Sequence, residues 1–446
     1  MFDFFKRLKY GKQYGYEVLY KNQLSRAVGK PGVIVAEMGM PDTYEFEFYN
    51  HFMHHVFDYM LPSFVKPMVL ADKGIALIDP ANPLAREPFE PENLIDPAGS
   101  FVNQAGVPYV ECETEWKPPG MKKNPWDHGY FLYKGDGLSG AADICDKVGA
   151  KIVGWYYGKL IPEKRVAWRS QLRKVYEEAV AELKVRFPDA EFRQAYYMHP
   201  ETMAAAVEEL LAAGCETIVY QSLTCPVYTD FEDYGHSLPL IHKLVDGRAH
   251  VMMADQLGSQ PAMGEAYVAI LKDRLAEIPA DASVFVILSA HGHPFKKETQ
   301  DERAPLYRGP LEQAVRDLME RRSGRWGLTW SFDEYADPYY DPKNTKKETM
   351  MAYEEGIQQG YDFIIELPTD FPAENTDLMI FHAMKKFTPF EDYDRDAPIP
   401  YPDWDKPLVR TFHKGDTTGI YAGTPVGPYR KFVVDALIGS ITAVLE

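Results

Sequence analysis

Residues 284–294 read VFVILSAHGHP, and this stretch is the strongest structural signal in the chain. An apolar run rich in Val and Ile leads into Ser289-Ala290-His291 and stops at Gly292 and Pro294. Such a run, bounded by turn formers, is typical of a buried parallel strand. His291 then lies at the carboxyl end of that strand, where open α/β sheets bind their ligands. A histidine there can exchange protons near neutral pH or ligate a metal.

Strand-like and helix-like segments alternate over most of the chain on either side of this stretch. The pattern predicts further strands at residues 32–35, 192–197, 217–221, 251–254, 326–331 and 363–367. It predicts helices at residues 44–60, 163–187, 201–213, 262–278, 346–359, 375–386 and 430–444. Strands that alternate with helices of ten or more residues indicate βαβ units and a parallel sheet.

Composition and charge narrow the class of protein. The chain has 446 residues and a formal net charge of −18, which argues against nucleic acid as a partner. It has no apolar run long enough to span a membrane and no secretory signal pattern, and its four cysteines show no CxxC spacing. We expect a cytoplasmic protein with reduced thiols. A peripheral membrane contact through the aromatic N-terminus is an alternative.

Two groups of residues besides His291 could carry chemistry. Glu374 and Asp377 follow the strand at 363–367 and are spaced to lie on one helical face. They predict either a carboxylate facing His291 across a cleft or a helix cap. His51 and His55 stand one helical turn apart, a spacing that suits a metal site or a solvated polar face.

Several motifs, in order along the chain, resemble those of the ferrochelatase family, which inserts ferrous iron into a porphyrin. These are the turn Gly39-Met40-Pro41-Asp42 after the first strand, Ser289-Ala290-His291, and the late segment with Pro368, Phe371, Glu374-Asn375 and Asp377. Weaker matches lie at residues 197–200, 222–228, 330–331, 338–342 and 428–445. The chain resembles a divergent member with a long, irregular insertion at about 62–130 and no C-terminal iron–sulfur cluster.

The resemblance implies an α/β fold of two Rossmann-like lobes, each a parallel sheet flanked by helices, with a chelatase-like cleft between them. We expect an N-terminal arm at 1–30, a first lobe at 31–235 and a second lobe at 236–386. Residues 387–446 would form an acidic, proline-rich linker and a helix that returns to the first lobe.

The resemblance also implies a lyase-type metal chelatase of heme biosynthesis, with a porphyrin and a divalent metal as partners and no cofactor beyond the substrate iron. His291 would be the base and a metal ligand, with Asp377 as its partner carboxylate and Glu374 in reserve. His51 and His55 would be further metal ligands. The tetrapyrrole would contact Met40, Asp42, His199, Tyr228, His236, Trp330 and Ser331.

Three alternatives stay open at this point. The chain could be a chelatase for another metal or tetrapyrrole. It could be a porphyrin- or haem-binding protein without activity, which the replacement of the family's histidine by Asn375 favours. It could also use the fold for another metal-dependent reaction.

Overall fold

The computed structural model describes most of two α/β units and their connections. The described residues are 25–43, 168–225, 237–291, 298–333, 346–375, 386–394, 397–399 and 406–446, together with positions 45, 48, 75–76, 133–134, 166 and 378. The expected helix at 44–60 and the irregular insertion therefore lie almost wholly outside the described residues.

The first sheet has four parallel strands in the order β4-β1-β5-β6. Their bounds are Pro31–Glu37 for β1, Glu191–Tyr196 for β4, Thr217–Ser222 for β5 and His250–Met253 for β6. β1 and β5 are central and almost fully buried, which explains their continuous apolar runs. Helices α7 (Trp168–Arg186), α8 (Pro200–Ala212) and α9 (Leu238–Val245) accompany this sheet.

The second sheet has five strands in the order β10-β11-β9-β7-β8, and only β10 is antiparallel to its neighbour. The strands are β7 (Val284–Ala290), β8 (Trp326–Phe332), β9 (Phe363–Pro368), β10 (Arg410–Lys414) and β11 (Thr417–Tyr421). All seven residues of β7 are buried between β8 and β9. β7 is thus an interior strand of this sheet, between β9 and the edge strand β8.

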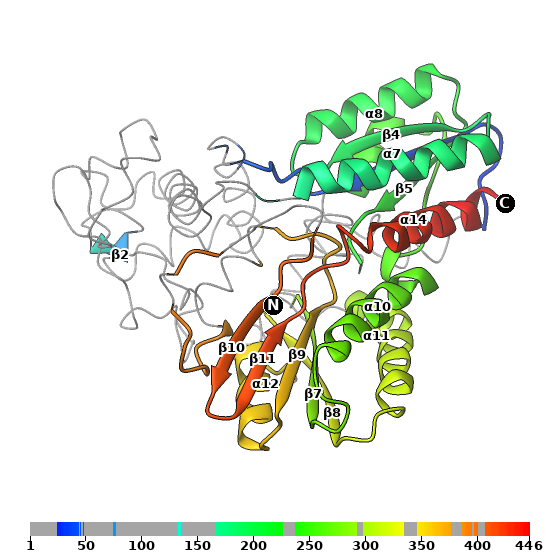
Figure 1. Ribbon diagram of the computed structural model, residues 1–446. Helices are drawn as coiled ribbons and strands as arrows, with labels where there is room; N and C mark the ends of the chain where they lie inside the picture. The colour runs from blue at the N-terminus through cyan, green and yellow to red at the C-terminus, as the bar shows by residue number, and fades with distance from the viewer. Residues whose placement is uncertain are drawn as a thin grey trace.

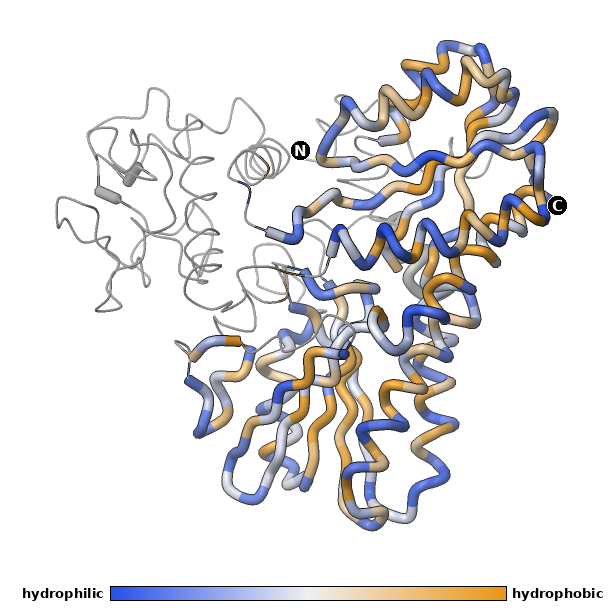
Figure 2. Tube along the Cα trace, turned by 45° about the horizontal axis from the view of Figure 1, so that its top comes forward, coloured by the Kyte–Doolittle hydropathy of each residue, from blue (hydrophilic) through white to orange (hydrophobic). Residues whose placement is uncertain are grey.

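Helices cover the second sheet and connect it to the first. They are α10 (Pro261–Ala276), α11 (Glu298–Met319) and α12 (Thr349–Gln358), preceded by the short 3₁₀ helix η3 (Leu257–Ser259). The closing helix α14 (Arg430–Leu445) lies between α7 and α10 and contacts both (Figure 1). Its largely apolar surface explains this position, because it buries contacts with both units (Figure 2). A two-stranded pair, β2 (Ile75–Ala76) and β3 (Tyr133–Lys134), stands apart.

The mixed α/β class with parallel sheets is confirmed, but the strand pairing differs from the expected division in two places. β6 lies beyond residue 235, yet it pairs with β5 and completes the first sheet. The expected linker region supplies β10 and β11, which extend the second sheet because β11 pairs with β9. The exact limits of the domains stay a proposal.

Candidate functional site

The carboxyl ends of the central strands carry polar side chains in both sheets. In the first sheet β1 ends at Glu37. In the second sheet His291 directly follows β7, Asp333 follows β8, and Asp370 comes two residues after β9. Because ligands of parallel α/β sheets bind at this edge, the surroundings of these four residues define the candidate site.

Glu37 is a buried carboxylate of which only one oxygen is bonded. Its Oε2 accepts hydrogen bonds of 2.6 Å from the backbone N–H of Gly39 and of 2.6 Å from Nε1 of Trp168. Its Oε1 is buried and has no hydrogen-bond partner among the described residues. Burial raises the pKa of Glu37 to about 7, although both hydrogen bonds act to lower it. Glu37 therefore changes its charge near neutral pH.

The turn after β1 shapes this arrangement. Gly39 has a φ of +82°, a region that favours glycine, and a Cβ there would lie 2.6 Å from the Cβ of Tyr196. The turn brings the N–H of Gly39 back onto the carboxylate of Glu37. The glycine at this place is thus required by the backbone and by the close packing of Tyr196.

A chain of side-chain contacts crosses from the first sheet to the second. The Trp168 ring, next to Glu37, lies 6.0 Å from the ring of Phe371, edge to face. The Phe371 ring in turn lies 5.5 Å from the half-buried ring of His291, also edge to face. The backbone N–H of His291 donates to Oδ2 of Asp370 at 2.8 Å. We call Glu37, Trp168, Phe371, His291 and Asp370 the junction cluster.

Backbone bonds hold the junction cluster in place. The N–H of Cys225, just after β5, donates to the backbone oxygen of Asp370 at 3.3 Å. The hydroxyl of Tyr267 on α10 donates to the backbone oxygen of Thr369 at 2.7 Å, and the hydroxyl of Tyr307 on α11 bonds the same oxygen. Burial raises the pKa of Asp370, against the opposing charge of Arg308 at 4.0 Å. Both carboxylates of the cluster are thus strongly desolvated.

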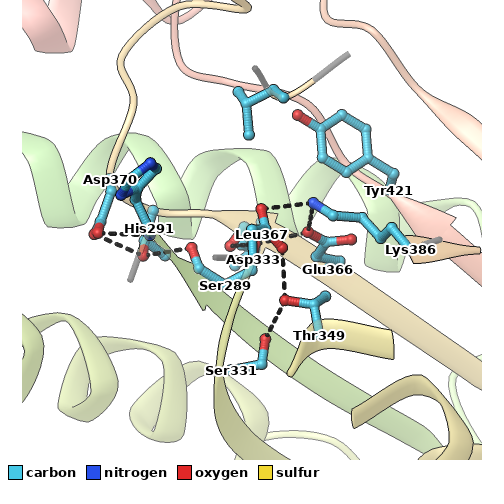
Figure 3. A network of polar contacts seen from close by, with 12 residues as sticks. Ser289, His291, Ser331, Asp333, Thr349, Glu366, Leu367, Asp370, Lys386 and Tyr421 are labelled. Atoms are coloured by element: carbon cyan, nitrogen blue, oxygen red, sulfur yellow. Dashed lines mark hydrogen bonds and ion pairs between the residues drawn. The ribbon is translucent and has the colours of Figure 1, made fainter. Parts of the chain in front are cut away.

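A second group of buried charges lies beside the cluster, under the ends of β7, β8 and β9 (Figure 3). Lys386 Nζ pairs with Oδ2 of Asp333 at 2.8 Å and with Oε1 of Glu366 at 2.7 Å. Glu366 also accepts from Ser289 at 2.7 Å and Tyr353 at 2.8 Å. The side chains of Lys386, Asp333 and Glu366 are 2%, 5% and 0% exposed, respectively. We call these three residues the Lys386 network.

The Lys386 network is well paired, which favours a structural role. Thr349 donates to Oδ1 of Asp333 at 2.6 Å and lies 2.9 Å from the hydroxyl of Ser331. Burial acts to lower the pKa of Lys386, but the charges of Asp333 and Glu366 outweigh it and raise that pKa. The lysine therefore stays charged, and two of its three N–H donors are taken up by these carboxylates.

The expected site residues fall into two groups, those inside and those outside the described part of the chain. His51, His55, Tyr228, His236 and Asp377 lie outside the described residues. The structure therefore tests neither the expected pairing of His291 with Asp377 nor three of the four residues expected to be metal ligands. In the part of the chain that is described, no group of three or more His, Cys, Asp or Glu could hold a metal ion.

The reserve carboxylate, Glu374, is buried and bonded to β11. It accepts hydrogen bonds from the hydroxyl of Tyr421 at 3.0 and 3.2 Å and from the N–H of Thr424 at 3.1 Å. Burial raises the pKa of Glu374 to about 7, against these bonds. The contacts of Glu374 thus tie it to the second sheet and its following loop.

The other expected contacts make local bonds. Met40 is buried directly after the glycine turn, and Oδ1 of Asp42 accepts from the N–H of Ser170 at 3.0 Å near the start of α7. The residue before α8 is His199, whose Nδ1 lies 3.2 Å from Glu201. Nε1 of Trp330 donates to Glu312 at 2.8 Å, and Ser331 contacts Thr349. Of the expected residues, His291 alone belongs to the junction cluster.

Sequence reasoning overlooked Glu37, Trp168 and the Lys386 network. A signal existed for the two glutamates, because Glu37 ends and Glu366 interrupts an otherwise apolar, buried strand. A charged residue in such a strand must find partners or change its pKa, and either outcome marks a special site. Trp168 and Lys386 carry no comparable local signal.

The comparisons with known proteins identify no family. No family model matches the chain, and no curated protein matches it. One similar solved structure is an ABC transporter solute-binding protein from Clostridium phytofermentas with bound L-rhamnose, at 11% identity and a TM-score of 0.25. That match covers 63% of this chain and 78% of the other. Another is a LacI-family repressor from Corynebacterium glutamicum, at 10% identity and a TM-score of 0.25, covering 62% and 86%.

A third similar structure is AraP, an arabinose-binding protein from Geobacillus stearothermophilus. It is 14% identical, with a TM-score of 0.25, and the match covers 48% of this chain and 64% of that protein. TM-scores of this size carry no inference about the ligand or activity of this chain.

These findings correct the expectation of a ferrochelatase. No family model supports it, and the three similar structures named above are described as sugar-binding proteins or a transcription regulator, not as chelatases. The prediction of membership in the ferrochelatase family is therefore wrong. So are the predictions of metal insertion, of lyase activity, of a role in heme biosynthesis and of porphyrin or metal partners. The alternative of an inactive porphyrin-binding protein is not supported either. The loose motifs coincide with the ends of strands, a feature of α/β proteins in general. Their order along the chain therefore did not identify a family.

Within the described residues, no helix is long and apolar enough to cross a membrane.

Proposed function

We propose that this chain binds a small, hydroxyl-rich molecule, such as a polyol or monosaccharide, at the junction cluster. The observation that carries the proposal is the unpaired Oε1 of Glu37, buried at the carboxyl end of β1. A buried acceptor without a donor costs roughly 1–3 kcal/mol, and more when it is charged. A ligand that donates a hydrogen bond to Oε1 recovers this free energy, whereas the unliganded protein bears it.

The titration of Glu37 selects the hydroxyl group among possible ligand groups. With a pKa of about 7, Glu37 is present at neutral pH both as a carboxylate and as a carboxylic acid. A carboxylate accepts only, while the acid also donates a hydrogen bond. An ammonium group would suit only the first form and a ligand anion only the second. A hydroxyl both donates and accepts, so it suits either form.

An unpaired donor is found in the segment that follows β9 and contains Phe371. Asn375 comes four residues after Phe371 and is fully buried. Its Oδ1 accepts from the N–H of Leu378 at 2.8 Å, but its buried Nδ2 has no hydrogen-bond partner among the described residues. An unmatched acceptor and an unmatched donor on neutral or titrating groups suit a neutral polar ligand better than an ion.

The position and the aromatic rings agree with this class of ligand. Ligand sites of α/β proteins lie at the carboxyl edges of sheets and between structural units. Trp168 supplies apolar surface next to Glu37, and Phe371 packs on Trp168. His291 is the half-buried polar member of the cluster. Rhamnose and arabinose, named with two of the similar structures, belong to this class, but the proposal rests on the contacts of Glu37 and Asn375.

The experiment is isothermal titration calorimetry with a panel of monosaccharides and polyols at pH 6, 7 and 8. The test variant is Glu37→Gln, whose amide oxygen can keep the bonds from Gly39 and Trp168 while its NH₂ replaces the free acceptor. We expect at least one member of the panel to bind. The variant should bind it about tenfold or more weakly, the loss expected for a hydrogen bond to a charged group.

The matched control is Glu208→Gln, an exposed glutamate paired with Arg248 on the surface. It should bind as the unmodified protein does. The proposal fails if no member of the panel binds, or if Glu37→Gln binds with unchanged affinity.

A further inference from the structure

Arg410 is a buried cation that lacks a partner of opposite charge. It opens β10 and is 9% exposed. Among the described residues, its buried Nη1 has no hydrogen-bond partner and no carboxylate forms an ion pair with it. Lys386, also a buried cation under this sheet, has two carboxylates. Within the described part of the second sheet, Arg410 is therefore a buried charge that is not balanced.

Aromatic rings surround this guanidinium. Its central carbon lies 5.2 Å from the ring centre of Phe387 and 4.9 Å from that of Phe412, and these two rings stack on each other at 4.4 Å. Such contacts attract a cation through the ring faces and hold the guanidinium plane in place. They provide no hydrogen-bond acceptor for Nη1, so they leave its N–H groups available.

Two of the neighbouring tyrosines, Tyr353 and Tyr421, do not supply the missing negative charge. Burial raises the pKa of Tyr353 and of Tyr421 well above the usual value, so both stay neutral. Their hydroxyls donate to Glu366 and Glu374, respectively. Burial lowers the pKa of Arg410 itself to about 10, which still leaves it charged at neutral pH.

Strand register places Arg410 at the ligand-binding edge of the sheet. It stands opposite Tyr421, the last residue of β11, and Tyr421 stands beside Glu366 near the carboxyl end of β9. An arginine at this edge, buried and held by rings, presents planar N–H donors in a fixed orientation. This geometry matches the oxygens of a carboxylate or phosphate group better than a spherical ion.

We propose that Arg410 binds an oxyanion, the carboxylate or phosphate group of a small molecule, at the edge of β10 and β11. The site is separate from the junction cluster and does not depend on the function proposed for Glu37. The bound oxygen accepts a hydrogen bond from Nη1 and supplies the negative charge that the described residues lack. A buried guanidinium is costly without such a partner, so anion binding should stabilise the fold.

The test measures thermal unfolding in sodium phosphate, sodium acetate and sodium chloride at equal ionic strength. Phosphate stabilises proteins in general by exclusion from their surface, so only a difference between variants counts. We compare the full chain with Arg410→Met, and with Arg325→Met as the matched control. Arg325 also lies on a ring, that of Tyr361 at 4.0 Å, but it is exposed and bonded to the backbone oxygens of Gln359 and Gly360.

We expect phosphate or acetate to raise the melting temperature of the unmodified chain and of Arg325→Met more than chloride does. Arg410→Met should lose this extra rise. A phosphate effect alone identifies a phosphate ligand, and an acetate effect identifies a carboxylate. An equal extra rise in Arg410→Met, or no extra rise in the unmodified chain, overturns the proposal.

A second variant covers the case in which Arg410→Met does not fold. Arg410→Lys keeps the charge but loses the planar pair of donors. We expect it to bind the active anion about tenfold more weakly in calorimetry, the loss of one charge-assisted hydrogen bond. Unchanged affinity in Arg410→Lys would show that the anion binds elsewhere.

Discussion

The indole N–H of Trp168 donates a 2.6 Å hydrogen bond to Oε2 of Glu37, a carboxylate that lies 131 residues earlier in the chain. This bond joins the first turn of α7 to the carboxyl end of β1. Both side chains are fully buried, so no water replaces the bond when it is lost. The Trp168–Glu37 pair thereby fixes where the ring of Trp168 meets Phe371 of the second sheet.

We predict that Trp168→Phe destabilises the protein by about 1–3 kcal/mol, because it leaves a buried carboxylate oxygen with one donor fewer. Urea denaturation measures the change. Trp330→Phe is the matched control, since Nε1 of Trp330 also donates to a glutamate, Glu312, but in a partly exposed place. Trp330→Phe should lower the free energy of unfolding by less than Trp168→Phe does. Equal losses in the two variants would mean that burial of the Glu37 bond adds nothing.

The stability of the protein should fall as the pH rises from about 5 to 8. Burial raises the pKa of both Glu37 and Glu374 from 4.5 to about 7. Each carboxyl is then protonated more readily in the folded than in the unfolded chain. Its contribution is fully present below pH 4.5 and is lost as the pH rises through about 7. The full shift corresponds to roughly 3 kcal/mol for each group.

Urea denaturation at a series of pH values checks this prediction. Glu37→Gln should flatten the curve between pH 5 and 8, because the amide does not titrate, and Glu374→Gln should do the same independently. Glu208→Gln, at an exposed position, should leave the slope unchanged. A stability that rises over this range, or a slope that neither buried variant alters, would contradict the assigned shifts.

The sequence predicted every strand of the two sheets except the hairpin of β10 and β11. β7 is buried at every residue, so its apolar run was a sufficient signal. β10 reads RTFHK and alternates between buried and exposed positions as the outer strand of a hairpin. Its polar residues resemble a loop because only one face needs apolar side chains. The hairpin was therefore hidden within the region expected to be a linker.

The candidate site was predictable only at its strand ends. The position of His291 after β7 followed from the local pattern, and it lies in the junction cluster. The partners of Glu37 were not predictable, because Trp168 approaches it through the packing of α7 on the first sheet. The same holds for Lys386, which reaches Asp333 and Glu366 from distant parts of the chain. Contacts of this kind depend on tertiary packing and leave no periodic trace in the sequence.

The turn at Gly39 should tolerate no side chain. A Cβ there would lie 2.6 Å from the Cβ of Tyr196, and the φ of +82° is itself unfavourable for other residues. We expect Gly39→Ala to destabilise the protein by more than the roughly 1–2 kcal/mol that the backbone strain alone costs. Gly214→Ala is the control, because Gly214 has a similar φ of +78° and open space around its Cβ position. If chemical denaturation shows equal losses for both, the clash with Tyr196 relaxes freely.

The Lys386 network should respond very differently to single and double substitution. Lys386→Met leaves Asp333 and Glu366 as two buried carboxylates without a cation, which costs about 3–5 kcal/mol. In Lys386→Met combined with Glu366→Gln, one of the two charges is gone. Ser289 and Tyr353 can still donate to the oxygen of the new amide. The double variant should therefore be more stable than Lys386→Met, as measured by urea denaturation.

A double-mutant cycle with Glu366→Gln alone completes this test. If the three residues act as one unit, the two substitutions are strongly non-additive, and the second recovers part of the loss caused by the first. Additive losses would show that Lys386 contributes through packing of its aliphatic stem and not through its charge. The network lies next to Ser289 at the end of β7, beside the junction cluster and not within it. Its loss should therefore weaken ligand binding at the junction cluster less than Glu37→Gln does.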